Sequence, residues 1–322
     1  MGELFYKLRN INRAGITYDE CKELLKETKE AGIKIGNYTL TVIIKNTAEI
    51  TLDELYELKE QGISNIKIFD EKSDNEPDNY WISDLILIKE KIQEYIKNIP
   101  EVSDDDPDKE KKIFTYIYEK MAYNITYDDY AADCVGLTGY ERDMTEEMVN
   151  RASGLYGGLI DNKAICAGYS EILRNILSEV GINAEYRSGH GEKGGHAWNQ
   201  VQLDGIWYNC DITNDADFIL EGLKVPHFLK SNMNFTRYEK YPIVKEEKVR
   251  ECNVDISDEQ QEILIEEQRT RILEEERDKN IEKEPNKGFI SRIVSFFEKS
   301  NLKLKEMKGI EMNRAVKAAK ER

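Results

Sequence analysis

Residues 157–181 read GGLIDNKAICAGYSEILRNILSEVG, and this stretch decides how the centre of the chain folds. After the leading glycines, apolar residues recur at helical spacing until Gly181 ends the pattern. The pattern predicts a buried helix with Cys166 at its N-terminus. The unpaired amides of a helix N-terminus stabilise a thiolate and lower the pKa of a thiol. Cys166 is therefore a candidate nucleophile, although a small buried cysteine on a core helix is the more common use of this residue.

A predicted β-hairpin follows this helix. Residues 182–187 read as a strand, a glycine-rich turn comes next, and His196 opens a second strand that runs to Leu203. The Asp-Gly pair after Leu203 is a strong hairpin turn, and the return strand 206–210 ends at Asp211. Pairing of the strands would bring Asp211 to the end of the sheet where His196 lies.

Cys166, His196 and Asp211 have the residue types and the order that thiol catalysis requires. The imidazole would take or share the thiol proton, and the carboxylate would fix the tautomer of the imidazole. A hydrogen-bonded strand histidine and a strand-end aspartate are the structural alternatives, and we favour catalysis because the three residues coincide. His190 is expected in a mobile loop, and His227 is expected in a packing position.

At these residues the chain resembles the transglutaminase-like superfamily, in particular its bacterial peptidase-like members. The resemblance covers about residues 108–235 and rests on three motifs in the same order, GGLIDNKAICAGY (157–169), HAWN (196–199) and DGIWYNCDIT (204–213). It implies an α+β fold with a papain/transglutaminase-like core, in which the nucleophile helix lies against an antiparallel sheet. It also assigns Cys166, His196 and Asp211 as the triad. Ile165 and Ala167 stand where animal transglutaminases have Gln and Trp, which argues against protein cross-linking.

The function that follows is thiol-dependent acyl transfer on peptide or side-chain amides through a Cys166 thioester, without a metal or an organic cofactor. Hydrolysis by a cysteine peptidase or amidase is favoured over transamidation by a protein-glutamine γ-glutamyltransferase. A non-catalytic scaffold with a relic triad is the third alternative. Tyr156, Tyr169 and Trp198 are candidate substrate or oxyanion groups beside the backbone amide of Cys166, although Trp198 is more typical of a core residue.

The residues before this domain predict a small α/β module over 1–75. Its expected elements are a helix over 17–31, a strand over 38–44, a helix that starts with a capping box at Thr51 and Glu54, and a strand over 63–69. Strand, helix and strand together suggest a βαβ unit.

A linker and an apolar helix are predicted over 76–107, followed by the catalytic domain over 108–250. Four acidic residues surround Pro107 ahead of the first helix of that domain, namely Asp104, Asp105, Asp106 and Asp108. We interpret them as helix N-terminal residues rather than a calcium loop, because the regular spacing of oxygen ligands is missing.

Residues 251–322 predict a charged helical C-terminal extension. Residues 257–284 indicate a solvated helix with a narrow apolar stripe. Lysine and arginine dominate 286–322, which also carries an amphipathic apolar patch. That segment could contact an anionic membrane or a protein partner, and packing against the acidic body of the molecule is the favoured alternative.

The composition limits which partners and which cellular location we expect. The 322 residues carry a formal net charge of −17, which repels phosphate backbones, so we expect a protein or peptide substrate and no nucleic acid. The five cysteines are widely spread without C-x-x-C spacing, which argues against a zinc site or a disulfide framework. No apolar leader or bilayer-length apolar run is present, which predicts a cytoplasmic location.

Overall fold

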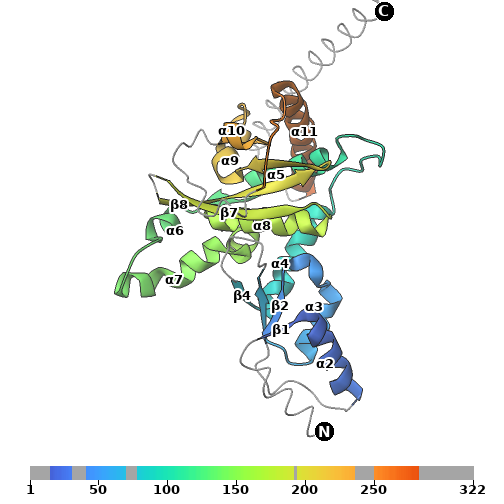
Figure 1. Cartoon of the computed structure of the whole chain (residues 1–322), viewed down its shortest axis with the longest axis vertical. Coiled ribbons are helices and arrows are strands. Elements are labelled where there is room, and N and C mark those ends of the chain that lie inside the picture. Colours follow the sequence, from blue (N-terminus) through green and yellow to red (C-terminus); the bar gives the residue numbers. More distant parts are fainter. Residues whose placement is uncertain (1–14, 31–40, 70–77, 192–193, 236–249, 283–322) are drawn as a thin grey trace, which may run out of the picture.

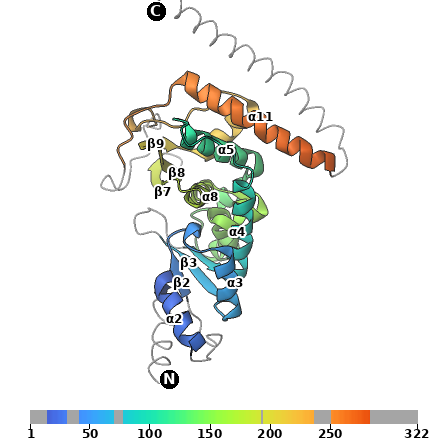
Figure 2. The same ribbon diagram turned by 90° about the vertical axis from the view of Figure 1, so that its right-hand side faces the viewer.

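The computed structural model describes residues 15–30, 41–69, 78–191, 194–235 and 250–282, which form a mixed α and β structure. A four-stranded sheet with its helices lies at one end of the molecule, and a three-stranded antiparallel sheet lies toward the other end (Figure 1). Helices occupy the region between the two sheets and cover the second sheet (Figure 2).

The N-terminal module is built on a βαβ unit, as predicted. Its elements are β1 (Ile16–Thr17), α2 (Tyr18–Glu30), β2 (Thr41–Ile44), α3 (Leu52–Glu60), β3 (Asn65–Ile68) and β4 (Asp78–Trp81). Strands β1, β2 and β3 are parallel, and β4 joins β3 in the antiparallel sense. The predicted capping box of Thr51 and Glu54 starts α3. Because β4 belongs to this sheet, the module continues beyond residue 75.

Two long helices connect the module to the rest of the chain, namely α4 (Ile82–Ile96) and α5 (Lys109–Asn124). The acidic residues ahead of α5 bind lysines of its first turns. Asp104 pairs with Lys109 at 2.5 Å, Asp106 with Lys112 at 2.6 Å and Asp108 with Lys111 at 3.1 Å. These carboxylates therefore stabilise the start of the helix.

The helix predicted after residue 165 is α8 (Cys166–Glu179), and it begins at Cys166. Before it come the short paired strands β5 (Thr126–Tyr127) and β6 (Lys163–Ala164), helices α6 (Asp129–Cys134) and α7 (Tyr140–Ser153), and a π-helical turn over Gly157–Asp161. Ten consecutive residues of α8, from Gly168 to Leu177, are buried. The helix therefore forms the centre of the molecule, with the antiparallel sheet on one side of it.

That sheet consists of β7 (Ala184–Gly191), β8 (Gly194–Leu203) and β9 (Ile206–Cys210) in this order. Asp204 and Gly205 have φ values of 50° and 81°, which are typical of the tight turn predicted there. The first hairpin is longer than predicted, because Gly189, His190 and Gly191 pair with β8. Glycine suggests a turn by composition, but its backbone N–H and C=O groups can still form a ladder.

The C-terminal part of the described chain contributes α9 (Ile212–Glu221), α10 (Asn232–Phe235) and α11 (Asp258–Glu282). Helix α11 packs against α5, and it buries the polar residues Gln261, Glu266, Gln268 and Arg269 as well as apolar ones. The prediction of a solvated helix with a narrow stripe was therefore wrong, because the charge-rich sequence hides a buried face, on which Gln261 donates to the carbonyl of Val225 and Arg269 to the carbonyl of Ile219. The predicted contact segment 286–322 lies outside the described residues.

The loop after β2 fastens the N-terminal module to α8 by buried polar bonds. The backbone N–H of Thr47 donates to Oδ1 of Asn175 at 2.9 Å, and Nζ of Lys89 donates to the carbonyl of Thr47 at 2.6 Å. Lys89 also pairs with Glu179 at 2.5 Å, and both side chains are almost fully buried. These bonds therefore hold the N-terminal module against the helix that carries Cys166.

Asn175→Ala is expected to lower the free energy of unfolding by about 1–3 kcal/mol, because it leaves the buried N–H of Thr47 without its acceptor. Urea denaturation would measure the change. The matched control is Asn183→Ala, which removes an exposed amide bond to Gln202 and should cost no more than about 0.5 kcal/mol. Equal losses in the two variants would show that the bond between Asn175 and Thr47 does not stabilise the packing of the module on α8.

Candidate functional site

Cys166 occupies the first position of α8 and is half-buried, whereas the other four cysteines are buried. Ile165 precedes the helix in an extended conformation, and its apolar side chain provides no cap for the first turn. The amides of that turn therefore point toward the start of the helix and find no acceptor in the side chain of the N-cap residue. A thiol at this position meets the positive end of the helix dipole.

The antiparallel sheet brings His196 and Asp211 together as the sequence predicts. His196 lies near the start of β8, and Asp211 follows the last residue of β9 and caps α9. The two side chains are in contact, with Nε2 of His196 2.7 Å from Oδ2 of Asp211. Their exposed fractions are 11% and 2%, so water competes little for this bond.

The third predicted residue, Cys166, also interacts with this histidine. Burial by itself lowers the pKa of His196, but the attraction and hydrogen bond of Asp211, together with a hydrogen bond to Cys166, raise this pKa to about 10. Burial also raises the pKa of Asp211, and the charge and hydrogen bond of His196 outweigh it and hold this pKa below its usual value. Because Nε2 bonds to Asp211, Nδ1 is the ring nitrogen that can bond to the thiol of Cys166.

Asn214 is a further member of the site, beyond the three residues that the sequence predicts. Its Nδ2 donates to Oδ2 of Asp211 at 2.6 Å and lies 3.3 Å from Nε2 of His196. Its backbone N–H donates to Oδ1 of Asp211 at 3.2 Å. The carboxylate is thereby held at both oxygens. The signal that could have found Asn214 is its position three residues after an N-cap aspartate.

A second buried cluster lies behind Asp211. Asp215, one helical turn further along α9, accepts a bond from the hydroxyl of Tyr118 at 2.8 Å and lies 2.9 Å from Nδ1 of His227. The backbone N–H of His227 donates to the same carboxylate at 3.0 Å. His227 is thus a buried, hydrogen-bonded packing residue that fixes the chain after α9, in keeping with its expected packing position.

The candidate substrate or oxyanion residues Tyr156, Tyr169 and Trp198 make other contacts, which do not favour such a role. Tyr169 is buried, and its hydroxyl donates to the carbonyl of Ile125 at 2.7 Å, so this hydroxyl is already bonded away from the thiol. Trp198 is buried and packs with the ring of Phe235, which fits a core role. Tyr156 lies under the guanidinium of Arg151, 4.1 Å from the ring centre.

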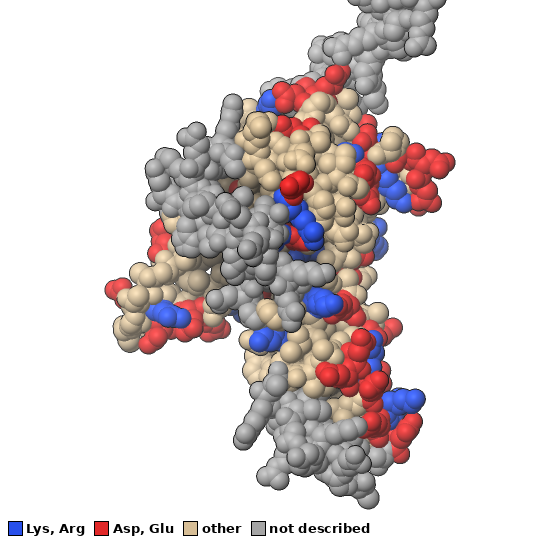
Figure 3. All heavy atoms as spheres, viewed as in Figure 1, with Lys and Arg blue, Asp and Glu red and all other residues tan. Residues whose placement is uncertain are grey.

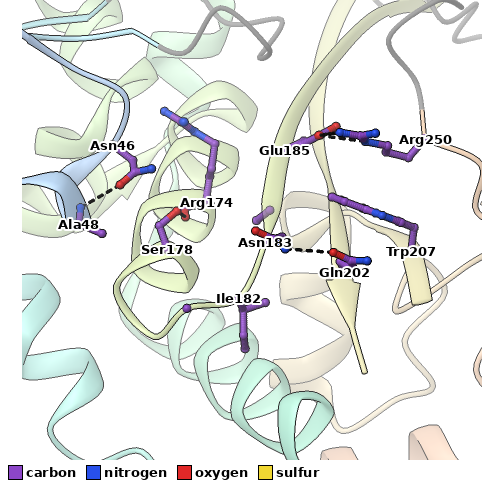
Figure 4. A pocket seen from close by; sticks show the side chains of 12 residues that line it. Asn46, Ala48, Arg174, Ser178, Ile182, Asn183, Glu185, Gln202, Trp207 and Arg250 are labelled. Carbon is purple, nitrogen blue, oxygen red and sulfur yellow. Dashed lines mark hydrogen bonds and ion pairs between the residues drawn. The ribbon is translucent and has the colours of Figure 1, made fainter. Parts of the chain in front are cut away.

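A separate polar pocket of about 580 Å³ lies between the loop after β2, the second half of α8, and the sheet (Figure 4). Its lining includes none of Cys166, His196 and Asp211. Trp207 lines it, with the guanidinium of Arg250 5.2 Å from the ring centre. Trp207 therefore belongs to the wall of this pocket.

His190 lies in β7 opposite Gly195, within the hairpin and not in the loop that its sequence context predicted. The reason is again that the glycines around it pair with the neighbouring strand. No helix among the described residues is both long and apolar enough to cross a bilayer.

Comparisons with known proteins give distant similarity to several solved structures, including the two that follow. One is the crystal structure of a transglutaminase, with 21% identity and a TM-score of 0.31 over 41% of this chain and 32% of that one. The other is a proposed cysteine protease from Cytophaga hutchinsonii, with 14% identity and a TM-score of 0.25 over 39% of this chain and 37% of the other. The matched region spans about a third of the length of each neighbour. No protein-family profile matches the sequence, and no curated protein matches it either.

Proposed function

We propose that the protein is a thiol-dependent acyl-transfer enzyme that acts on peptide or side-chain amides, with hydrolysis as its main outcome. The observation that carries the proposal is the placement of one imidazole, which bonds to the buried Asp211 at 2.7 Å and to the half-buried Cys166. This arrangement pairs a nucleophile with a base and the base with an orienting carboxylate.

The proposed reaction uses only side chains of this chain. The thiol proton passes to His196, and the Cys166 sulfur attacks the amide carbonyl to form a tetrahedral intermediate. The imidazolium then protonates the departing amine, the C–N bond breaks, and a thioester remains on Cys166. Water attacks this thioester while His196 takes its proton, which releases the carboxylic acid and restores the thiol. Asp211 keeps the imidazole in one tautomer throughout.

Charge on the carbonyl oxygen of the intermediate requires a hydrogen-bond donor. The first-turn amides of α8 are the best candidates, because the N-cap residue Ile165 offers them no side-chain acceptor. The backbone N–H of Cys166 itself is the donor that we propose, whereas the hydroxyl of Tyr169 is bonded to Ile125. The uncapped helix end thus supports both the thiolate and the oxyanion.

The pH dependence of cysteine alkylation, read at each cysteine by mass spectrometry, tests this proposal. Cys166 is expected to react fast well below pH 8, and His196→Ala should remove that reactivity. The other cysteines provide internal controls, because burial raises the pKa of Cys21 and of Cys252 to about 12 in each case. If Cys166 reacts no faster than these two, or reacts equally without His196, the catalytic proposal fails.

Transamidation is the alternative outcome at the same thioester, because an amine can replace water as the second nucleophile. A labelled primary amine offered together with a polypeptide substrate would distinguish the two reactions. Hydrolysis predicts release of the acid without incorporation of the label. A non-catalytic scaffold is the remaining alternative, and it predicts that Cys166→Ala changes no cellular phenotype.

A further inference from the structure

Helices α6 and α7 form an arm, residues 128–153, that projects from the body of the molecule beside the start of α8 (Figure 1). Ala152 is the one buried residue of α7 in this structure, although the helix spans 14 residues that are all described. Large apolar side chains stand exposed on the arm. The exposed fractions are 67% for Tyr130, 55% for Val135, 77% for Tyr140 and 69% for Met144. Tyr140 and Met144 are four residues apart and so lie on one face of α7, and neighbouring exposed apolar side chains of this kind are typical of interaction surfaces.

The same arm is strongly acidic (Figure 3). Between residues 128 and 153 there are two cations, Arg142 and Arg151, and seven acidic residues, namely Asp128, Asp129, Asp133, Glu141, Asp143, Glu146 and Glu147. The formal charge of the arm is therefore −5. The acidic residues of α7 are exposed, and none of them forms an ion pair with a described residue, in contrast to the acidic residues ahead of α5. Their field is directed into solvent and attracts cations.

The root of the arm is attached to the chain segment that ends at Cys166. Ile165 packs with Ala131 of α6 and Ala152 of α7, and its backbone N–H donates to the carbonyl of Ala152 at 3.0 Å. The N–H of Asp128 donates to the carbonyl of Ala164 at 3.0 Å. The base of the arm therefore lies next to the chain segment that carries the candidate nucleophile.

We propose that the α6–α7 arm is a docking surface for a separate polypeptide rich in lysine and arginine with interspersed apolar residues, and that this polypeptide is the substrate class of the Cys166 site. The second part of this inference, that the bound polypeptide is the substrate, rests on the proposed function. Charge complementarity selects a basic occupant, because the arm repels an anionic lipid surface and the acidic body of a second copy. Exposed tyrosine and methionine side chains supply the apolar contacts.

Binding of a labelled synthetic peptide of alternating lysine and leucine to the full-length chain tests the arm. The triple variant Asp143→Asn, Glu146→Gln and Glu147→Gln is expected to weaken binding by about tenfold and to flatten its salt dependence. The matched control neutralises one aspartate and two glutamates that are exposed on α3, as Asp53→Asn, Glu57→Gln and Glu60→Gln. The control variant should bind as the wild type does.

Equal affinity in the two triple variants would overturn the proposal, as would equal binding of a peptide with glutamine in place of lysine. Dimerisation of the wild type through the arm would assign the surface to a second copy. Carbodiimide cross-links between α7 and lysines of 286–322 would assign it to the chain's own tail. Because peptide binding requires no turnover, a failure here is distinguishable from a failure of the proposed chemistry, which cysteine alkylation tests separately.

Discussion

Asp211→Asn is expected to slow the acylation of Cys166 by a small activated ester, such as p-nitrophenyl acetate, by about 10²–10⁴-fold. The carboxylate is 2% exposed and lies 2.7 Å from Nε2 of His196, so it stabilises the imidazolium that forms when the thiol loses its proton. An asparagine keeps the shape but not the charge, and its amide can bond to the wrong tautomer of the ring. The pKa of His196 should then fall, and the thiolate should lose its counter-ion.

The fold should survive this change, because asparagine is as good an N-cap as aspartate and can still accept the N–H of Asn214. Asp217→Asn is the matched control, since it removes the same charge from an exposed position on the same helix. Asn214→Ala should cause a smaller loss than Asp211→Asn, because the charge remains and only its orientation loosens. If Asp211→Asn reacts as fast as Asp217→Asn, Asp211 has no role in activating the thiol.

Gly168→Ala is expected to lower the free energy of unfolding by at least about 2 kcal/mol, although alanine normally stabilises a helix interior by about 1 kcal/mol relative to glycine. A Cβ atom at this position would overlap the backbone carbonyl of Ala152 and lie 3.0 Å from the Cβ of Ala164. A backbone carbonyl cannot rotate away as a side chain does, so α7 and α8 must separate. Because Cys166 lies two residues earlier, its alkylation rate should change as well.

Urea denaturation measures this effect, and Gly195→Ala is the control beside the other candidate residue, His196. A Cβ there meets nothing closer than the carbonyl of Gly189 at 3.9 Å, so the free energy of unfolding should change by no more than about 0.5 kcal/mol. A Gly168→Ala protein as stable as the wild type would show that α7 is not packed tightly against the start of α8.

Some features of the site followed from short-range patterns in the sequence. Apolar spacing after residue 166 and the terminal Gly181 were enough to locate α8 and to put Cys166 at its first position. The Asp-Gly turn fixed the register of β8 and β9, and that register carries Asp211 back toward His196. Each of these patterns lies within about one helix or one hairpin, where local backbone preferences dominate.

Other features depended on contacts between segments far apart in the chain. The bond of Asn175 to the loop after β2 joins residues 128 positions apart, and the hydroxyl of Tyr169 reaches Ile125 across 44 positions. The burial of α11 likewise depends on α5, which its own charge-rich sequence does not reveal.

The sequence by itself therefore determined the local elements and the order of the three candidate residues. The tertiary structure decided the long-range contacts of the site. The amide of Asn214 bonds to the carboxylate of Asp211, Asn175 of α8 bonds to the loop after β2, and the hydroxyl of Tyr169 bonds to the carbonyl of Ile125. The physical reason is that helix and hairpin preferences act over a few residues, whereas a buried polar group takes the partner that packing brings to it.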